Sequence, residues 1–267
     1  MKKANVLVAK EEGRKKLCGV NPVLEALRAG RRPISEITIA DGAGNDRLRE
    51  LLELARERKI PVRRAPRARI DRDAGTRNHQ GVFAKVAAAR YADAEELLAS
   101  LEVEVQNKRS PLVVLLDGVE DPRNFGAILR TAEGAGAQGV FVPERRAVGL
   151  TETVARAAAG ALECVPVARV GNLVRLIEQL KERNVWVVGA DAAAPTVYSE
   201  WDWTQPAAAV FGGEGSGLHR LVRERCDALV RIPLLGHLGS LNVSVAVGIV
   251  LFEALRQRGS FASRKEN

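Results

Sequence analysis

The sequence predicts an α/β protein in which a small N-terminal α/β domain precedes a larger domain built on a parallel sheet. From Pro111 onward, apolar runs such as LVVLLDGV alternate with amphipathic segments, and strands separated by helices imply a parallel sheet covered on both faces. Before Pro111 the alternating elements are shorter and more polar, which is typical of a separate small domain. With 267 residues, 46% of them hydrophobic, the chain is long enough for two cores.

The N-terminal elements define a domain of residues 15–89, which follows a basic tail of residues 1–14. NPVLEALRAG is expected to be a short helix with Asn21 as N-cap, Pro22 at the first helical position and Gly30 as its stop. ISEITIADG is expected to be a strand, and DRLRELLELARERKI a helix with its leucines on one face. PVRRAP and HQGVFAKVAAA are expected to be further strands.

Residues 90–110 are interpreted as a polar, partly helical linker, residues 111–260 as the larger domain, and residues 261–267 as a tail. In the larger domain we expect strands in LVVLLDGV, QGVFVP, ECVPVARV, VWVVGA, PAAAVFGGEGSGL and ALVRIPLLG. The helices expected between them are FGAILRTAEGAGA, TETVARAAAGAL and GNLVRLIEQLKERN. In such sheets, ligands bind beyond the carboxyl ends of the strands.

The last element, which follows IPLLGHLGSLNVSVAVG, has an ambiguous pattern. Its valines alternate with small residues as in a strand, but the segment from Ser240 to Arg256 is longer than most strands. We therefore expect a helix that is buried most of the way round, with Ser240 as a candidate N-cap. On a helical period one face carries Val243, Val247, Val250, Leu251 and Ala254, and Val245, Ile249 and Phe252 cover much of the other side.

The basic charge is concentrated in the N-terminal third of the chain. Residues 1–90 hold 22 Lys or Arg against 11 Asp or Glu, whereas residues 91–267 hold 19 against 22. A polyanion such as RNA is the natural partner of a basic surface, through phosphate contacts and counterion release. A surface that is merely solvated is the alternative reading.

Cysteine use and hydropathy exclude several other classes. Cys18, Cys164 and Cys226 are odd in number and widely spaced, which argues against a disulfide framework and against a metal site. No apolar run is long enough to span a bilayer, and the N-terminus does not resemble a secretory signal. We therefore expect a cytoplasmic protein with buried, inert thiols.

Three loops combine glycines with polar side chains. In DGVEDPRNFGAILRTAEGAG, Asn124 lies where a helix begins, and Arg130 lies among apolar neighbours, so that it requires either an ion pair or an aqueous cleft. In VFGGEGSGLHR the glycines allow close approach of a ligand, although Glu214 could also be exposed on a plain turn. In the third loop, Ser240 and Asn242 could simply cap the following helix.

Taken together, the three motifs are much more specific than any one of them. D-x-x-x-D-P-x-N-x-G-A-I-x-R-T-A, V-F-G-G-E-G-x-G-L and I-P-x-x-G-x-x-x-S-L-N-V-S-V-A occur in this order over residues 111–258. This combination resembles the SpoU/TrmH family of RNA ribose 2'-O-methyltransferases, within the SPOUT superfamily. The N-terminal LCGVNPVLEAL and NHQGVFAKV also look like the substrate-binding domain of the branch that methylates a guanosine of 23S rRNA.

The resemblance implies S-adenosylmethionine as methyl donor, a trefoil knot in the C-terminal domain, and a homodimer with each active site completed near the partner subunit. From the cysteine pattern and the hydropathy we expect no metal and no membrane partner. The residues that the resemblance assigns to cofactor binding are Gly212, Gly213, Ile232, Leu234, Gly236 and Leu241. Those that it assigns to the catalytic site are Asn124, Arg130, Glu214, Ser240 and Asn242.

Within this site we expect Arg130 to orient the ribose and stabilise the developing alkoxide, because an arginine resists deprotonation. Asn124 and Glu214 would position Arg130 and the substrate. The histidines lie outside the motif positions and are not assigned to catalysis. The expected RNA contacts are Arg63, Arg64, Arg67, Arg69, Arg77 and His79. Two alternatives stay open: methylation of tRNA or another rRNA site, and a non-catalytic RNA-binding or ribosome-assembly protein.

Overall fold

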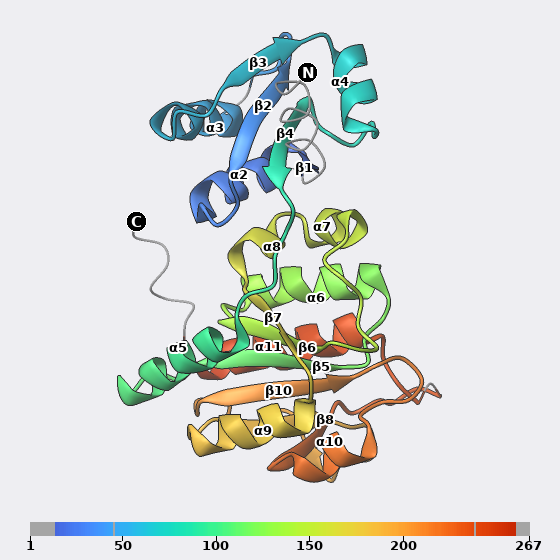
Figure 1. Cartoon of the computed structure of the whole chain (residues 1–267). Helices are drawn as coiled ribbons and strands as arrows, with labels where there is room; N and C mark the ends of the chain where they lie inside the picture. Colours follow the sequence, from blue (N-terminus) through green and yellow to red (C-terminus); the bar gives the residue numbers. More distant parts are fainter. Residues whose placement is uncertain (1–13, 45, 238, 260–267) are drawn as a thin grey trace, which may run out of the picture. The chain divides into compact units, whose positions relative to one another are not determined.

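The computed structural model describes residues 14–44, 46–237 and 239–259, and these form two compact units (Figure 1). Unit 1 contains the described residues up to Arg90 together with the short segment Ala159–Cys164. Unit 2 contains Tyr91–Ala158 and the described residues from Val165 onward. No helix within the described ranges is long and apolar enough to cross a membrane.

Unit 1 is built on a four-stranded sheet with the order β1-β4-β2-β3. The strands are β1 (Arg14–Cys18), β2 (Ile34–Ala40), β3 (Val62–Ala65) and β4 (Val82–Ala87). β3 pairs in parallel with β2, whereas the other two pairings are antiparallel. The helices of unit 1 are α2 (Val20–Ala29), α3 (Asp46–Glu57), α4 (Arg67–Ala74) and α8 (Ala161–Cys164). The core lies where the apolar faces of α2 and α3 pack against the sheet.

The start of α2 differs from the prediction. The helix begins at Val20, and its N-cap is Gly19 with φ 105, so Asn21 lies inside the first turn and does not cap it. The Asn21 side chain instead accepts a hydrogen bond from Arg47 at 2.8 Å. A positive φ at Gly19 is accessible because glycine has no Cβ. The predicted stop is confirmed, since Gly30 adopts the left-handed conformation at φ 65.

Unit 2 contains a seven-stranded sheet, with the order β7-β6-β5-β10-β8-β11-β9, in which every pairing is parallel. This confirms the predicted parallel sheet. Its strands are β5 (Leu112–Asp117), β6 (Gly139–Pro143), β7 (Val167–Val170), β8 (Trp186–Ala190), β9 (Thr196–Val197), β10 (Ala207–Gly212) and β11 (Ala228–Arg231).

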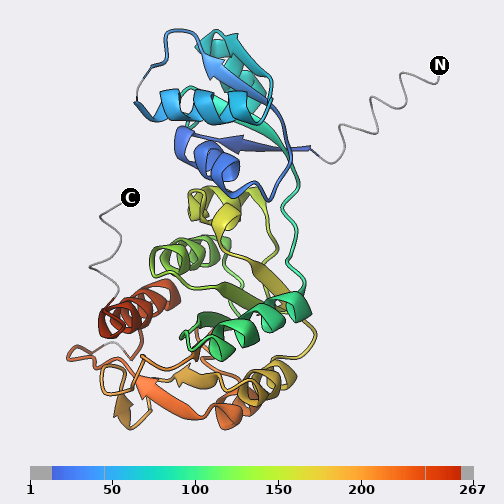
Figure 2. The same ribbon diagram turned by 90° about the vertical axis from the view of Figure 1, so that its left-hand side faces the viewer.

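Helices cover both faces of this sheet (Figures 1 and 2). On one face lie α5 (Ala94–Gln106), α9 (Leu173–Glu182) and α10 (Arg220–Arg225), which share a core with inward residues of the central strands. On the other face lie α6 (Pro122–Gly134), α7 (Glu152–Ala158) and α11 (Val243–Gln257). Figure 2 shows α11 alongside α6, and the two helices are in contact.

Of residues 90–110, which are predicted to be a linker, residues 91–110 form part of unit 2 instead. Asp93 caps α5 by accepting hydrogen bonds from the backbone of Glu95 and Glu96. Leu97, Leu98 and Leu101 of this helix are buried in the core of unit 2. The acidic composition of the segment hid this role, because its solvent-facing residues outnumber the leucines that pack inward.

The final segment is a helix, as predicted, but its N-cap and part of its burial differ. Asn242, not Ser240, is the cap, and its side chain accepts a hydrogen bond from the Ser244 backbone N–H at 2.9 Å. The predicted inner face is confirmed, since its buried residues are Val243, Val247, Val250, Leu251 and Ala254. The expectation of burial most of the way round is wrong for the single chain: Val245 is 49% exposed and Phe252 45% exposed.

Candidate active site

The candidate site lies where the strand order of the unit 2 sheet reverses. From β5 the chain proceeds outward to β6 and β7, and it then returns to the other side of β5 through β8 and β10. β5 and β10 are neighbours, with Asp117 and Gly212 in register at their carboxyl ends. This point in a parallel sheet is a topological switch point, where ligands bind in α/β proteins.

Close backbone packing joins the loops that follow β5 and β10. The Gly213 N–H donates to the Asp117 carbonyl at 2.8 Å. A Cβ at Gly213 would lie 2.0 Å from the carbonyl oxygen of Gly118, and one at Gly212 would lie 2.0 Å from the carbonyl carbon of Gly217. Backbone atoms cannot move aside as a flexible side chain can, so only glycine fits at these two positions.

A chain of side-chain hydrogen bonds unites the three sequence motifs. The Asn124 amide, in the first turn of α6, donates to a carboxylate oxygen of Glu214 in the loop after β10. The Asn242 amide donates to the Asn124 carbonyl oxygen at 3.1 Å. The Ser244 hydroxyl donates to the Asn242 side-chain oxygen at 2.6 Å. Asp121 fixes the α6 end of this network by accepting from the backbone N–H groups of the first turn.

Arg130 and Ser240 belong to the same region but not to this network. Arg130 is exposed on α6, and it forms no hydrogen bond or ion pair with any residue that the structure describes. The structural ion pair considered as an alternative for Arg130 is therefore absent from the described part of the chain. Ser240 is also exposed, and it lines the pocket beside Asn242. The guanidinium of Arg130 is thus free for an external ligand.

A pocket of about 670 Å³ lies beside the loops that follow β8, β10 and β11. It is lined by backbone and small side chains of the glycine-rich segment after β10, and by the apolar side chains Ile232, Leu234 and Leu241. All the residues predicted to bind the cofactor line this pocket except Gly236. The volume and the mixture of apolar surface with a few polar groups are typical of small-molecule sites.

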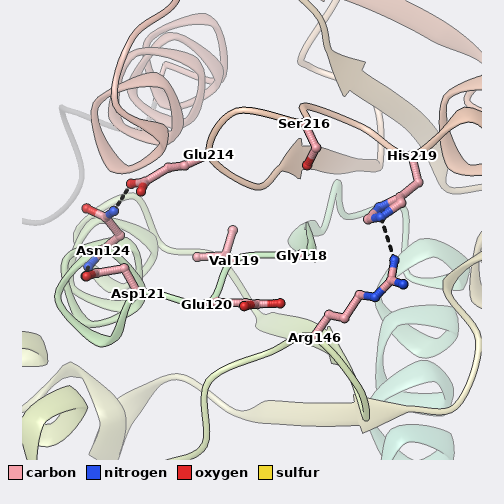
Figure 3. Close-up of a pocket in the computed structure, with 9 residues that line it drawn as sticks. All are labelled: Gly118, Val119, Glu120, Asp121, Asn124, Arg146, Glu214, Ser216 and His219. Atoms are coloured by element: carbon pink, nitrogen blue, oxygen red, sulfur yellow. Dashed lines mark hydrogen bonds between the residues drawn. The ribbon is translucent and has the colours of Figure 1, made fainter.

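A second pocket of about 440 Å³ lies next to the first, and Glu214 and Ser216 line both (Figure 3). Figure 3 shows Asn124 and Glu214 at one end of the second pocket, Arg146 and His219 at the other, and Glu120 between them. None of Glu120, Arg146 and His219 was predicted from the sequence to belong to the site. A usable signal was present, because Glu120 lies within the first motif and His219 directly follows the second.

His219 is oriented by a buried carboxylate. Asp117 accepts hydrogen bonds from the His219 backbone N–H at 2.7 Å and from its ring Nδ1 at 2.9 Å. Because a carboxylate only accepts, Nδ1 carries the proton, and Nε2 is left to accept from the Arg146 guanidinium at 3.2 Å. Asp117 and His219 together therefore hold the guanidinium of Arg146 at the edge of the pocket.

In unit 1, the arginines predicted to bind RNA are exposed in or near β3 and α4, namely Arg63, Arg64, Arg67, Arg69 and Arg77. The prediction for His79 is corrected. Its side chain is 0% exposed, its Nδ1 accepts from the Gly81 N–H at 2.9 Å, and its Nε2 donates to Asp71 at 2.7 Å. With both ring nitrogens used inside the domain, His79 is a core residue and has no atom available for RNA.

Cys18, Cys164 and Cys226 are free, and each is only half-buried, so the prediction that all three thiols are buried is not confirmed. Burial, reinforced by the nearby Asp227 carboxylate, raises the pKa of the Cys226 thiol to about 12, which keeps it protonated near neutral pH. Within the described ranges, no cluster of three or more His, Cys, Asp or Glu side chains could hold a metal ion.

Two family profiles match this chain, one for each unit. The SpoU rRNA Methylase family matches residues 111–252, and the RNA 2'-O ribose methyltransferase substrate binding family matches residues 16–92. YacO of Bacillus subtilis, named as a TrmH family tRNA/rRNA methyltransferase, is 43% identical over 240 residues, which cover 90% of this chain and 94% of YacO. A protein of Staphylococcus saprophyticus with the same family name is 43% identical over 242 residues, covering 91% of this chain and 95% of its own.

Solved structures show the same architecture. The SpoU methyltransferase AviRb from Streptomyces viridochromogenes, in complex with AdoMet, has a TM-score of 0.74 and 25% identity, and the match covers 94% of this chain and 93% of AviRb. An AdoMet-bound rRNA methyltransferase from Sinorhizobium meliloti has a TM-score of 0.72 and 27% identity, covering 96% and 90%. A TrmH/SpoU tRNA modifying enzyme from A. aeolicus is 34% identical with a TM-score of 0.52, covering 62% of this chain and 84% of its own.

Proposed function

The chain belongs to the SpoU rRNA methylase family of RNA methyltransferases, and we propose that it transfers a methyl group from S-adenosylmethionine to the ribose 2'-hydroxyl of a guanosine in 23S rRNA. The observation that carries this proposal is the hydrogen-bonded chain from Glu214 through Asn124 to Asn242. It places polar groups from three separate segments of the chain beside a glycine-lined pocket at the switch point of the sheet.

The larger pocket fits the cofactor. Its glycine-rich wall presents backbone atoms where any Cβ at Gly212 or Gly213 would collide, and its other wall offers Ile232 and Leu241 as apolar surface. Backbone hydrogen-bonding groups beside apolar side chains suit a ligand that joins a nucleoside to a charged amino-acid part. S-Adenosylmethionine supplies an electrophilic methyl group when it is bound.

The residues of the chain then have to align the 2'-hydroxyl and stabilise the charge that develops on its oxygen. Asn124 is held from both sides, by Glu214 and by Asn242, so its position is fixed before substrate binds. We assign Arg130 to the ribose and its neighbouring phosphate, because its guanidinium is exposed and free of partners among the described residues. A fixed positive charge at that oxygen would stabilise an alkoxide without being deprotonated itself.

We also propose that the protein works as a homodimer through α11. Val245 and Phe252 lie seven residues apart, so they share one side of the helix, and both are about half exposed. Large apolar side chains in a row on one face are typical of a surface that another chain covers. Because α11 contacts α6, this face would bring a second chain close to the helix that carries Arg130. We further propose that the C-terminal part of this unit forms a trefoil knot, as the family resemblance implies.

The share of this chain that each solved structure matches favours ribosomal RNA over tRNA as the substrate. The S. meliloti structure described as an rRNA methyltransferase matches 96% of this chain, and the match therefore includes unit 1. The A. aeolicus tRNA modifying enzyme matches only 62%. Unit 1 carries the excess positive charge of the chain, and its exposed Arg64, Arg67 and Arg77 have no ion pair among the described residues. We assign these arginines to phosphate contacts with RNA.

Mapping 2'-O-methyl groups in total RNA, from cells with and without this gene, tests the proposed target. We expect one guanosine of 23S rRNA to lose its methyl group when the gene is deleted. Loss of a tRNA methyl group instead would transfer the activity to tRNA. An unchanged map together with defective ribosome assembly would favour the non-catalytic alternative.

A single substitution tests the proposed chemistry. Arg130→Ala should abolish methyl transfer while the Kd for S-adenosylmethionine stays within a few-fold of wild type, because Arg130 does not line the cofactor pocket. Arg175→Ala is a matched control, since Arg175 is an exposed arginine on α9, which covers the opposite face of the sheet. Full methylation by Arg130→Ala would exclude every role that we assign to this residue.

A further inference from the structure

The second pocket holds a carboxylate and a guanidinium that do not neutralise each other. Glu120 and Arg146 both line it, and no ion pair joins them or either of them to another described residue. Opposite charges that share a pocket without pairing leave room for a ligand between them. That ligand must donate hydrogen bonds on one edge, toward Glu120, and accept them on another, toward Arg146.

Arg146 is held in place at some energetic cost. Its backbone has φ 57, in the left-handed region that a non-glycine residue rarely adopts. Such conformations persist where the surrounding structure enforces them, and they concentrate at ligand sites. Here the Val148 N–H donates to the Val119 carbonyl at 3.4 Å, which ties the loop after β6 to the loop after β5. Nε2 of His219, oriented by Asp117, then fixes the guanidinium.

The position of this pocket relates it to the proposed reaction. Glu214 and Ser216 line both pockets, so a ribose held at Asn124 and Glu214 could reach the cofactor pocket while its base lies toward Glu120. The pocket volume of about 440 Å³ is within the range of sites that hold small molecules. The other occupant that Arg146 could suit is a phosphate, but the Glu120 carboxylate in the same pocket would repel it.

We propose that this pocket binds the base of the methylated nucleotide and selects guanine. Guanine presents two adjacent donors, N1–H and the N2 amino group, which suit the two oxygens of the Glu120 carboxylate. On another edge it presents O6 and N7, the acceptor pair that an arginine binds in bidentate fashion. Adenine, cytosine and uracil each lack at least one of these two pairs. This inference rests on the proposed 2'-O-methyl transfer, and it assigns specificity to Glu120 and Arg146, with Asp117 and His219 as positioning residues.

The test pairs single-atom changes in the RNA with single changes in the protein. The substrates are synthetic RNAs that contain the nucleotide mapped by gene deletion, carrying guanosine, inosine or 7-deazaguanosine at that position. Inosine lacks the N2 amino group, and 7-deazaguanosine lacks N7. For the full-length wild-type protein, kcat/KM should fall about tenfold with each analogue, which is within the range measured for loss of a bidentate base contact.

Each variant should lose discrimination against only one analogue. Glu120→Ala should methylate guanosine and inosine equally, and it should still discriminate against 7-deazaguanosine. Arg146→Asn is chosen because asparagine tolerates the left-handed backbone. It should methylate guanosine and 7-deazaguanosine equally, and it should still discriminate against inosine. Glu133→Ala and Arg145→Asn are controls at exposed positions that do not line the pocket, and they should behave as wild type.

Two results would overturn the proposal while leaving methyl transfer intact. One is a mapped nucleotide that is not guanosine. The other is undiminished discrimination against inosine by Glu120→Ala, or against 7-deazaguanosine by Arg146→Asn, in variants whose S-adenosylmethionine binding shows them to be folded. Absence of methyl transfer by the wild-type protein to any of these RNAs would instead refute the proposed function, and this inference with it.

Discussion

Asn242 has two separable roles, and substitutions can test each of them. Its side-chain oxygen accepts from the Ser244 N–H at 2.9 Å and from the Ser244 hydroxyl at 2.6 Å, which caps α11. Its amide group donates to the Asn124 side-chain oxygen at 3.1 Å, which orients a residue of the proposed catalytic site. Asn242→Ala removes both roles, whereas Asn242→Asp keeps the cap and removes only the donor.

The structure sets the expected sizes of these effects. Loss of an N-cap lowers the free energy of unfolding by about 1 kcal/mol, and loss of a side-chain hydrogen bond by about 1 kcal/mol more, so Asn242→Ala should lose about 2 kcal/mol. Asn242→Asp retains the acceptor and adds a negative charge at the N-terminus of a helix, so its stability should lie within about 1 kcal/mol of wild type. Its carboxylate cannot donate to Asn124, so methyl transfer should still fall by about tenfold or more, the equivalent of roughly 1.4 kcal/mol.

Urea unfolding followed by tryptophan fluorescence measures the stability of the relevant unit. All three tryptophans, Trp186, Trp201 and Trp203, lie in unit 2, so the signal reports that unit alone. Ser240→Ala is the control, since Ser240 does not cap the helix, and its stability should stay within about 0.5 kcal/mol of wild type. The reasoning would be refuted by an Asn242→Asp protein with wild-type turnover, or by an Asn242→Ala protein as stable as wild type.

Three further predictions concern backbone packing, the domain core and thiol reactivity. Gly213→Ala should abolish binding of S-adenosylmethionine in calorimetry, because its Cβ would meet a backbone oxygen at 2.0 Å, whereas Gly239→Ala, with open space around it, should bind normally. His79→Ala should weaken the amide-exchange protection of unit 1 by about 1–3 kcal/mol and leave the salt dependence of RNA binding unchanged. Arg64→Ala should leave the protection unchanged and reduce the salt dependence of RNA binding. Cys226, with a pKa of about 12, should resist alkylation at pH 8 in the native protein and react once urea unfolds the chain. Only the thiolate attacks the alkylating reagent, and burial raises the pH at which the thiolate forms. Rapid labelling of the native protein would contradict the burial of this thiol.

Much of the fold follows from local patterns that tertiary structure did not override. The nearly continuous apolar runs became buried parallel strands, since a strand covered on both faces is apolar along most of its length. The helical period of the last segment identified its buried face correctly. The segment of residues 90–110 was misjudged because three leucines are enough to bury one side of α5, although glutamates are interspersed among its apolar residues.

The candidate site was only partly predictable. Asn124, Glu214 and Asn242 are polar residues within or next to glycine-containing motifs. A sequence can indicate such positions without showing that one hydrogen-bonded chain links them. The position of His219 directly after the second motif marked it as a candidate. Its role could not be assigned from the sequence, because it depends on Asp117, which lies 102 residues earlier and meets it only through the pairing of β5 with β10. The burial of His79 could not be predicted either. The arginines near it in the sequence suggested an exposed surface, but the fold turns the imidazole inward.

The most direct measurement is nucleoside analysis of RNA after incubation with the purified protein. Unmodified 23S rRNA and S-adenosylmethionine are incubated with wild-type protein or with Arg130→Ala, the RNA is digested to nucleosides, and methylated nucleosides are identified by mass spectrometry. We predict that wild type forms 2'-O-methylguanosine and that Arg130→Ala forms none. A methyl group on a base, or no methylated nucleoside from the wild-type protein on either rRNA or tRNA, would contradict the proposed function.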